Sequence, residues 1–109
     1  MKLQKRFTDE QLEKIIDEAT IYMCACPAQV AEEIRRLRSM VLYQENCDLQ
    51  IDTDSVVHKS IAKAGLQALK VMEDCLDEVL DLEKWDRNTF LMPEGLRKRR
   101  DEEIAKGGD

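Results

Sequence analysis

Three cysteines are the residues of this sequence whose type and spacing offer the clearest chemistry. Cys24 and Cys26 lie in the segment Cys24-Ala25-Cys26-Pro27, and Cys75 lies much further along the chain. Proline is favoured as the first residue of a helix, so Cys26 is expected beside a helix N-terminus, where amide donors and the helix dipole stabilise a thiolate. Together the three thiols predict a redox site, or a site for zinc or another thiophilic metal.

Three other residues could complete such a site. Glu78 lies three residues after Cys75 and offers a carboxylate oxygen, while His58, the single histidine, is expected near Cys47. The alternative is that the cysteines are buried and inert, because free cysteine behaves as a small apolar residue. A Cys-x-Cys pair is also a much weaker metal signal than paired Cys-x-x-Cys motifs. We therefore expect no cofactor, and keep zinc or another thiophilic metal as the alternative.

The sequence contains none of the motifs of common enzyme classes. It has no glycine-rich phosphate loop, no Ser–His–Asp set and no nucleotide fingerprint. Six acidic residues between 73 and 83 could suggest a di-iron site, but such a site needs Glu-x-x-His motifs, and none occurs. We interpret this acidic run as a solvated helix face, and likewise the charged side of the second expected helix, which consists of Glu32, Glu33, Arg35, Arg36 and Arg38. A binding protein is favoured over an enzyme.

Length, composition and charge indicate the fold class. The chain has 109 residues, of which 43% are hydrophobic and 37% charged, with only two prolines and four glycines. This mixture predicts a single all-α domain built as an antiparallel helical bundle. The net charge of −6 repels phosphates, and the basic run at 97–100 is followed at once by three acidic residues, so nucleic-acid binding is not expected.

The sequence also bears on location. No stretch approaches the roughly 20 apolar residues that span a bilayer, and the N-terminus lacks the apolar core of a signal peptide. We therefore expect a cytoplasmic protein with no membrane partner. In that compartment its four cysteines are expected to be reduced thiols.

Hydrophobic periodicity divides the chain into three main helices and a weaker C-terminal helix, expected at about 8–24, 27–47, 54–85 and 93–106. Thr8 and Gln11 fit a capping box at the first helix, with Phe7 packing just before it. Residues 1–7 and 107–109 are expected to be flexible.

The third expected helix carries two neighbouring apolar stripes. The first consists of Val57, Ile61, Ala64, Ala68, Cys75, Val79 and Leu82. The second consists of Ala62, Gly65, Leu69, Met72, Leu76 and Leu80. Together they form a face wider than one partner helix covers, so this helix is either central to a bundle or shared with another chain. Ala64, Gly65 and Ala68 mark a point where another backbone could come close.

Helix lengths predict which residues lie at the same level. At 1.5 Å per residue, antiparallel second and third helices return Cys75 to the level of Cys26, close to Cys24. They also carry the third helix roughly ten residues past the turn between the first two. The apolar residues at this end need cover, which the apolar patch at 90–92 and the last helix could supply by folding back, or which a second copy of the chain could supply. We favour a homodimer, with an interface that consists of Val79, Leu80, Leu82, Trp85 and Phe90.

The wide apolar face and the missing catalytic set predict a non-enzymatic interaction or dimerisation module that uses the third helix. Its expected partner is a second copy of the chain or another protein. The alternative hypothesis is a metal-binding or redox-sensing protein that acts through Cys24, Cys26 and Cys75.

Overall fold

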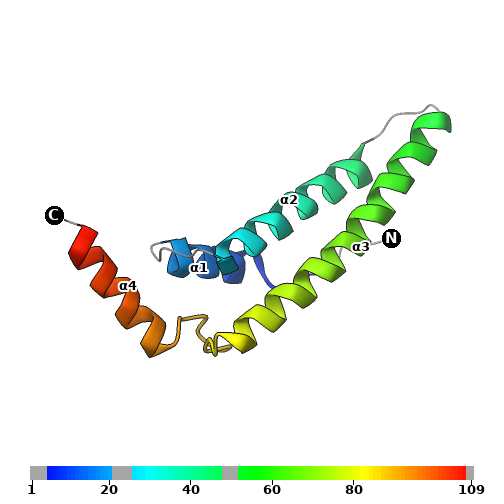
Figure 1. The fold of residues 1–109 in the computed structure, drawn as a ribbon. Helices are drawn as coiled ribbons and strands as arrows, with labels where there is room; N and C mark the ends of the chain where they lie inside the picture. The colour runs from blue at the N-terminus through cyan, green and yellow to red at the C-terminus, as the bar shows by residue number, and fades with distance from the viewer. Residues whose placement is uncertain (1–4, 21–25, 48–51, 108–109) are drawn as a thin grey trace.

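The computed structural model describes residues 5–20, 26–47 and 52–107 of the chain. This part contains four helices and no strand, which confirms the all-α fold. The helices, shown in Figure 1, are α1 (Asp9–Thr20), α2 (Cys26–Asn46), α3 (Asp52–Leu82) and α4 (Glu94–Gly107). Each begins within two residues of the start expected from the sequence.

The capping box predicted at the start of α1 is present. Thr8 Oγ1 accepts a hydrogen bond from the amide of Gln11 at 3.0 Å, and Gln11 Oε1 accepts one from the amide of Thr8 at 2.9 Å. Two amides that the helix leaves unpaired are thereby satisfied. Phe7, just before the cap, is 3% exposed and lies in the same core as Leu12. The first turn therefore has a polar and an apolar anchor.

A left-handed turn ends α3. Lys84 has a φ of 61°. The amide of Trp85 donates to the carbonyl of Leu80 at 2.9 Å, and the amide of Lys84 donates to the carbonyl of Asp81 at 3.1 Å. These are the two hydrogen bonds of a Schellman motif, which closes a helix and redirects the chain. Leu80 and Trp85, the apolar pair that accompanies the motif, are both buried. The chain after α3 is thus turned back toward the core.

Side chains from α1, α2, α3 and the segment after α3 form one apolar core. Its members are Phe7, Leu12, Ile15, Ala19, Ala28, Ala31, Ile34, Val41, Leu69, Leu76, Leu80, Trp85, Phe90 and Met92. In the described part of the chain, α1 packs on α2 and α2 packs on α3, whereas α4 packs on no other helix. The core therefore belongs to the first three helices and the segment at 85–92.

The two longest helices, α2 and α3, lie side by side (Figure 1). Gln44 contacts His58, and Arg38 contacts Glu73 further along the pair. Residue numbers thus fall along α2 as they rise along α3, so these two helices run in opposite directions. We call this pair the α2–α3 hairpin.

Gly65 sets the register of the α2–α3 hairpin. A Cβ atom on this glycine would lie 2.6 Å from Cγ2 of Val41 and 3.0 Å from Cε of Met40. Distances below 3.0 Å are not tolerated without a shift of one partner, so the two backbones approach as closely as they do because residue 65 has no side chain. At Gly65, the close approach expected from the small residues of α3 is therefore an approach to α2 of the same chain.

This register determines at which end α3, the longer helix, extends beyond α2. With Gly65 opposite Val41, the end of α2 lies level with about residue 60 of α3. By this register, the 31 residues of α3 extend beyond the 21 residues of α2 mainly at the N-terminal end of α3. The expected overhang of ten residues at the other end is wrong, because α3 does not begin level with the last turn of α2.

Replacing Gly65 with valine is expected to lower the free energy of unfolding by about 2 kcal/mol, because the added methyl groups overlap Val41 in a packed interface. A valine at Gln67, which is exposed and belongs to neither apolar stripe of α3, is the control and is expected to alter stability by about 0.5 kcal/mol or less. Urea denaturation followed by circular dichroism measures both. Equal effects of the two substitutions would contradict this assignment of the close approach.

The molecule is elongated. Its extents are 58 × 28 × 18 Å and its radius of gyration is 17.4 Å, whereas a compact chain of this length would have a radius of gyration of about 13 Å. In Figure 1, α4 leads away from the α2–α3 hairpin. Much helix surface in the described part of the chain is consequently left without cover from the chain itself.

Candidate interaction surface

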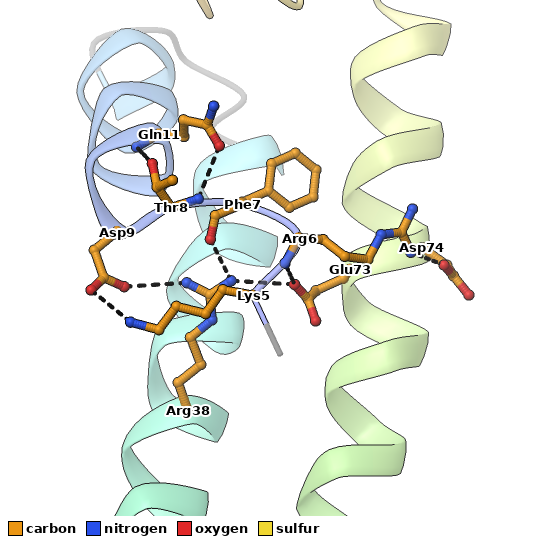
Figure 2. Close-up of polar contacts among 9 residues, drawn as sticks. All are labelled: Lys5, Arg6, Phe7, Thr8, Asp9, Gln11, Arg38, Glu73 and Asp74. Carbon is orange, nitrogen blue, oxygen red and sulfur yellow. Dashed lines mark hydrogen bonds and ion pairs between the residues drawn. The ribbon is translucent and has the colours of Figure 1, made fainter. Parts of the chain in front are cut away.

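A buried ion pair joins α2 to α3. The side chains of Arg38 and Glu73 are each 4% exposed, and Arg38 Nη2 donates to Glu73 Oε2 at 3.2 Å. Arg38 also donates to the carbonyl of Phe7 at 2.6 Å and to Asp9 at 3.2 Å (Figure 2). The sequence placed Arg38 and Glu73 on solvated faces. That expectation is wrong, because both are paired across the helix interface.

The same pair holds the segment before α1, residues 5–8, which we call the strap. The amide of Arg6 donates to Glu73 Oε2 at 2.9 Å, and the guanidinium of Arg6 contacts Asp74. Figure 2 shows the strap lying between α2 and α3 with these contacts on either side. Residues 1–7 were expected to be flexible, but their described part is fixed by these contacts and by the burial of Phe7.

The polar cluster around Arg38 has a structural role. Its charged groups are turned toward one another and toward the strap, and its two central side chains are nearly closed to solvent. A buried pair of this kind adds little net stability, but removing one member leaves an uncompensated charge in the interior. The cluster therefore favours one arrangement of the strap over the α2–α3 hairpin.

The segment that follows α3 covers the end of the core. Trp85, Phe90 and Met92 are at most 6% exposed, and the Phe90 ring meets the Phe7 ring edge to face, with centroids 6.2 Å apart. The amide of Met92 donates to a carboxylate oxygen of Glu18 on α1 at 3.1 Å. The apolar residues at this end of α3 are thus covered by the segment at 85–92 and the strap, without help from α4.

Arg87 binds the acidic residues of α3 from this segment. It contacts Asp77 and lies 2.8 Å from Asp81, and its guanidinium carbon is 5.8 Å from the centroid of the Phe7 ring. The hydrogen bond from Arg87 lowers the pKa of Asp77 below its ordinary value of 3.8. The hydrogen bond from Lys5 likewise lowers the pKa of Asp9. Part of the acidic run is therefore paired with arginine rather than simply hydrated.

Acid is expected to destabilise the fold through these carboxylates. Since the folded pKa of Asp77 lies below the unfolded value of 3.8, the aspartate contributes stability above that pH and loses it as the pH falls through the folded pKa. The free energy of unfolding should therefore fall as the pH is lowered below 3.8. Arg87→Met should flatten this fall, which denaturant titrations between pH 6 and pH 2 can measure. An unchanged pH slope in this variant would contradict the assignment.

One side of α3, next to the side that packs on α2, is only partly covered by the described part of the chain. Val71 is 65% exposed and Leu82 73% exposed. We call this side the outer stripe, and it consists of Val57, Ile61, Ala64, Ala68, Val71, Cys75, Val79 and Leu82, all exposed or half-buried. The second predicted stripe is instead in the core, where Leu69, Leu76 and Leu80 are at most 2% exposed.

Val71 was missing from the stripe that the sequence suggested. It lies three residues after Ala68 and four before Cys75, so it continues the spacing of the stripe without interruption. With Val71 included, successive members are separated by four, three, four, three, four, four and three residues. The spacing itself was the signal that could have identified it.

The residues expected at a homodimer interface are divided between the core and the surface. Leu80, Trp85 and Phe90 are at most 6% exposed and are packed within the chain. Val79 is half-buried, and Leu82 is largely exposed. Val79 and Leu82 therefore remain available to a partner, as members of the outer stripe.

The predicted cysteine site is only partly described. Cys26 is exposed as the first residue of α2, Cys75 is half-buried in the outer stripe, and Cys24 lies outside the described residues. With Gly65 opposite Val41, Cys75 lies level with about residue 31, some 7 Å along α2 from Cys26. Among the described residues, no three His, Cys, Asp or Glu side chains are grouped so that they could hold a metal ion. Glu78 is exposed.

His58 and Cys47 lie near each other at the opposite end of the α2–α3 hairpin. They line one pocket of about 230 Å³, together with Gln44. His58 Nδ1 is 2.5 Å from Gln44 Oε1, while its Nε2 is buried and has no hydrogen-bond partner among the described residues. A larger open pocket of about 960 Å³ lies between residues 84–93 and α4 and is lined by none of the predicted site residues.

Two further observations complete the description. No helix in the described part of the chain is both long enough and apolar enough to cross a membrane. Comparison with known proteins finds no family model that matches the chain, and no significant match among curated proteins or solved structures.

Proposed function

We propose that this protein is a non-enzymatic interaction module, and that the outer stripe of α3 binds a helix of another molecule, in the first place a second copy of the chain. The observation that supports the proposal most strongly is the stripe itself. Eight apolar positions follow one side of α3 at spacings of three and four, and none of them is fully buried.

The spacing of the outer stripe favours a helix as its partner. Apolar residues that alternate at three and four positions form the seam by which helices pack along their length. A helix face that only contacts water would carry polar residues at positions such as Val57 and Val71, which are 46% and 65% exposed. Contiguous exposed apolar surface of this kind is typical of binding sites.

The shape of the molecule supports the same proposal. The α2–α3 hairpin is held on one side by α1 and the strap, through the buried pair of Arg38 and Glu73. The polar contacts made by Arg6 and Arg87 keep that side closed. The outer stripe is on a different side of α3, so a partner can reach it without displacing the strap.

We place the protein in the cytoplasm, with its cysteines reduced.

Native mass spectrometry of the purified protein, in the presence of a reductant, tests this proposal. We expect a monomer–dimer equilibrium whose dimer fraction rises with protein concentration. A chain that stays monomeric up to about 1 mM would contradict self-association, because a dissociation constant above that value corresponds to a binding free energy of less than about 4 kcal/mol. The same spectrum reports any bound metal ion, and a stoichiometric ion would support the alternative in which the cysteines form a metal site.

A further inference from the structure

We infer that α3 pairs with α3 of a second copy in antiparallel orientation, about a two-fold axis that passes near Leu69 and Lys70. This inference rests on the proposed self-association and adds its geometry. Two independent properties of α3 support it: the order of the apolar residues in the outer stripe, and the order of the exposed charges along the helix.

The outer stripe matches its own reverse. Four pairs of stripe residues lie on either side of the point between Leu69 and Lys70, three of them at equal distances from it, whereas the pair of Ile61 and Val79 is centred on Lys70 instead. The pairs are Val57 with Leu82, Ile61 with Val79, Ala64 with Cys75, and Ala68 with Val71. An antiparallel partner therefore places each stripe residue level with an apolar residue of the other copy or one residue away from it, and the small Ala64 and Ala68 allow the helices to come close.

The exposed charges of α3 change sign near the same point. Among the described residues of α3, the exposed charged residues before it are Lys59 and Lys63, Lys70 stands directly beside it, and those further along are Asp74, Glu78 and Asp81. A parallel pair would place lysines beside lysines and carboxylates beside carboxylates. An antiparallel pair places the basic half of each helix beside the acidic half of the other, which favours this orientation over the parallel one.

Lys63 gives the sharpest test of this arrangement. In the antiparallel pair it lies level with residue 76 of the second copy, between Asp74 and Glu78. Within one chain, Lys63 and Glu78 are 15 residues apart on a continuous helix, so they are separated by about 22 Å. A direct bond between these two side chains can therefore form only between two copies.

Zero-length cross-linking with a carbodiimide, followed by mass spectrometry of the dimer band, is the direct experiment. We expect an isopeptide bond between Lys63 and Glu78 or Asp74, whose yield rises with protein concentration. Mixing chains labelled with ¹⁴N and ¹⁵N identifies the link as intermolecular. A dimer band in which Lys63 is cross-linked only to residues of α1 or α4 would overturn the antiparallel pairing.

A charge exchange provides the second test. Lys63→Glu is expected to weaken the dimer about tenfold, because it replaces attraction by repulsion twice in a two-fold pair, and Glu78→Lys should act similarly. The double variant, Lys63→Glu with Glu78→Lys, should return the dissociation constant to within about threefold of the original. Lys14→Glu, on the exposed surface of α1, is the control and should leave the constant unchanged.

The outcomes separate this inference from the proposed function. A protein that is monomeric at every concentration would overturn both. A dimer that forms normally, lacks the Lys63 link and shows additive effects of the two charge reversals would overturn only the antiparallel geometry. Glu78 is the residue chosen for exchange because Asp74 and Asp81 also contact Arg6 and Arg87 within the chain.

Discussion

Replacing Arg38 with methionine should lower the free energy of unfolding by about 3–5 kcal/mol, since it leaves a carboxylate buried without its partner. Glu73 is 4% exposed and would keep only the amide of Arg6 as a donor in the described contacts, while the carbonyl of Phe7 would lose its guanidinium. Domains of this size are stable by only about 5–15 kcal/mol. The single change is therefore expected to remove a large part of the total.

Two controls distinguish a buried charge from general damage to α2. Arg36→Met removes an arginine that is 73% exposed and pairs with Glu33, and should change stability by about 0.5 kcal/mol or less. The double variant Arg38→Met with Glu73→Met removes both charges and should recover at least half of the loss. Urea denaturation at one fixed protein concentration measures all four proteins. An Arg38→Met protein as stable as Arg36→Met would contradict the role given to the pair.

Replacing Val71 with glutamate should raise the dissociation constant of the dimer about 100-fold or more. Val71 is 65% exposed in the single chain, so the carboxylate stays hydrated there and the fold should keep its stability. In the dimer, two such carboxylates would enter an apolar seam close to the two-fold axis. Burying unpaired charges costs several kcal/mol, of which about 2.7 kcal/mol suffices for a 100-fold effect.

Tyr43→Glu is the matched control for this variant. Tyr43 is 67% exposed, nearly the same as Val71, but it lies on α2 and outside the outer stripe. Sedimentation equilibrium should show a normal dimer for Tyr43→Glu and a monomer for Val71→Glu at the same concentration. Equal weakening by both changes would indicate a general loss of apolar surface, and no weakening by either would exclude the outer stripe as the interface.

The elements of the fold were predictable because their signals are local. Periodicity located all four helices, and the capping box needed only Thr8 and Gln11, which are three residues apart. The end of α3 was less evident, because the left-handed turn is made by Lys84 rather than by a glycine. Local patterns thus gave the helices, with errors of a few residues at their ends.

The contacts between helices were not predictable in the same way. Arg38 and Glu73 are charged residues in a polar pattern, and only their tertiary pairing shows that they are buried. Gly65 was identified as a point of close approach, but its partner, Val41, depends on the register between α2 and α3. The expected positions of Cys26 and Cys75 along the α2–α3 hairpin changed for the same reason, because they depend on that register. A pattern along one helix cannot specify how far a second helix is displaced along it.

The outer stripe was identified only in part, for a related reason. The sequence indicated an apolar face wider than α2 could cover, and the structure shows which half of it is in the core. Residues such as Leu80 and Trp85 looked equally suited to an interface, but the chain after α3 turns back and covers them. Which apolar residues remain for a partner depends on that turn, and not on hydrophobicity alone.

The reactivity of Cys75 tests the central claim most directly, because this thiol is a native member of the outer stripe and needs no substitution. A short pulse of a maleimide, quantified at each cysteine by mass spectrometry, reports its accessibility across protein concentrations from about 1 µM to 1 mM. Cys47, also half-buried but outside the stripe, in the pocket that it lines with His58, is the internal reference. We predict that labelling of Cys75 slows as the dimer forms while labelling of Cys47 stays constant. A Cys75 rate that does not depend on concentration would contradict the assignment of the outer stripe as the binding surface.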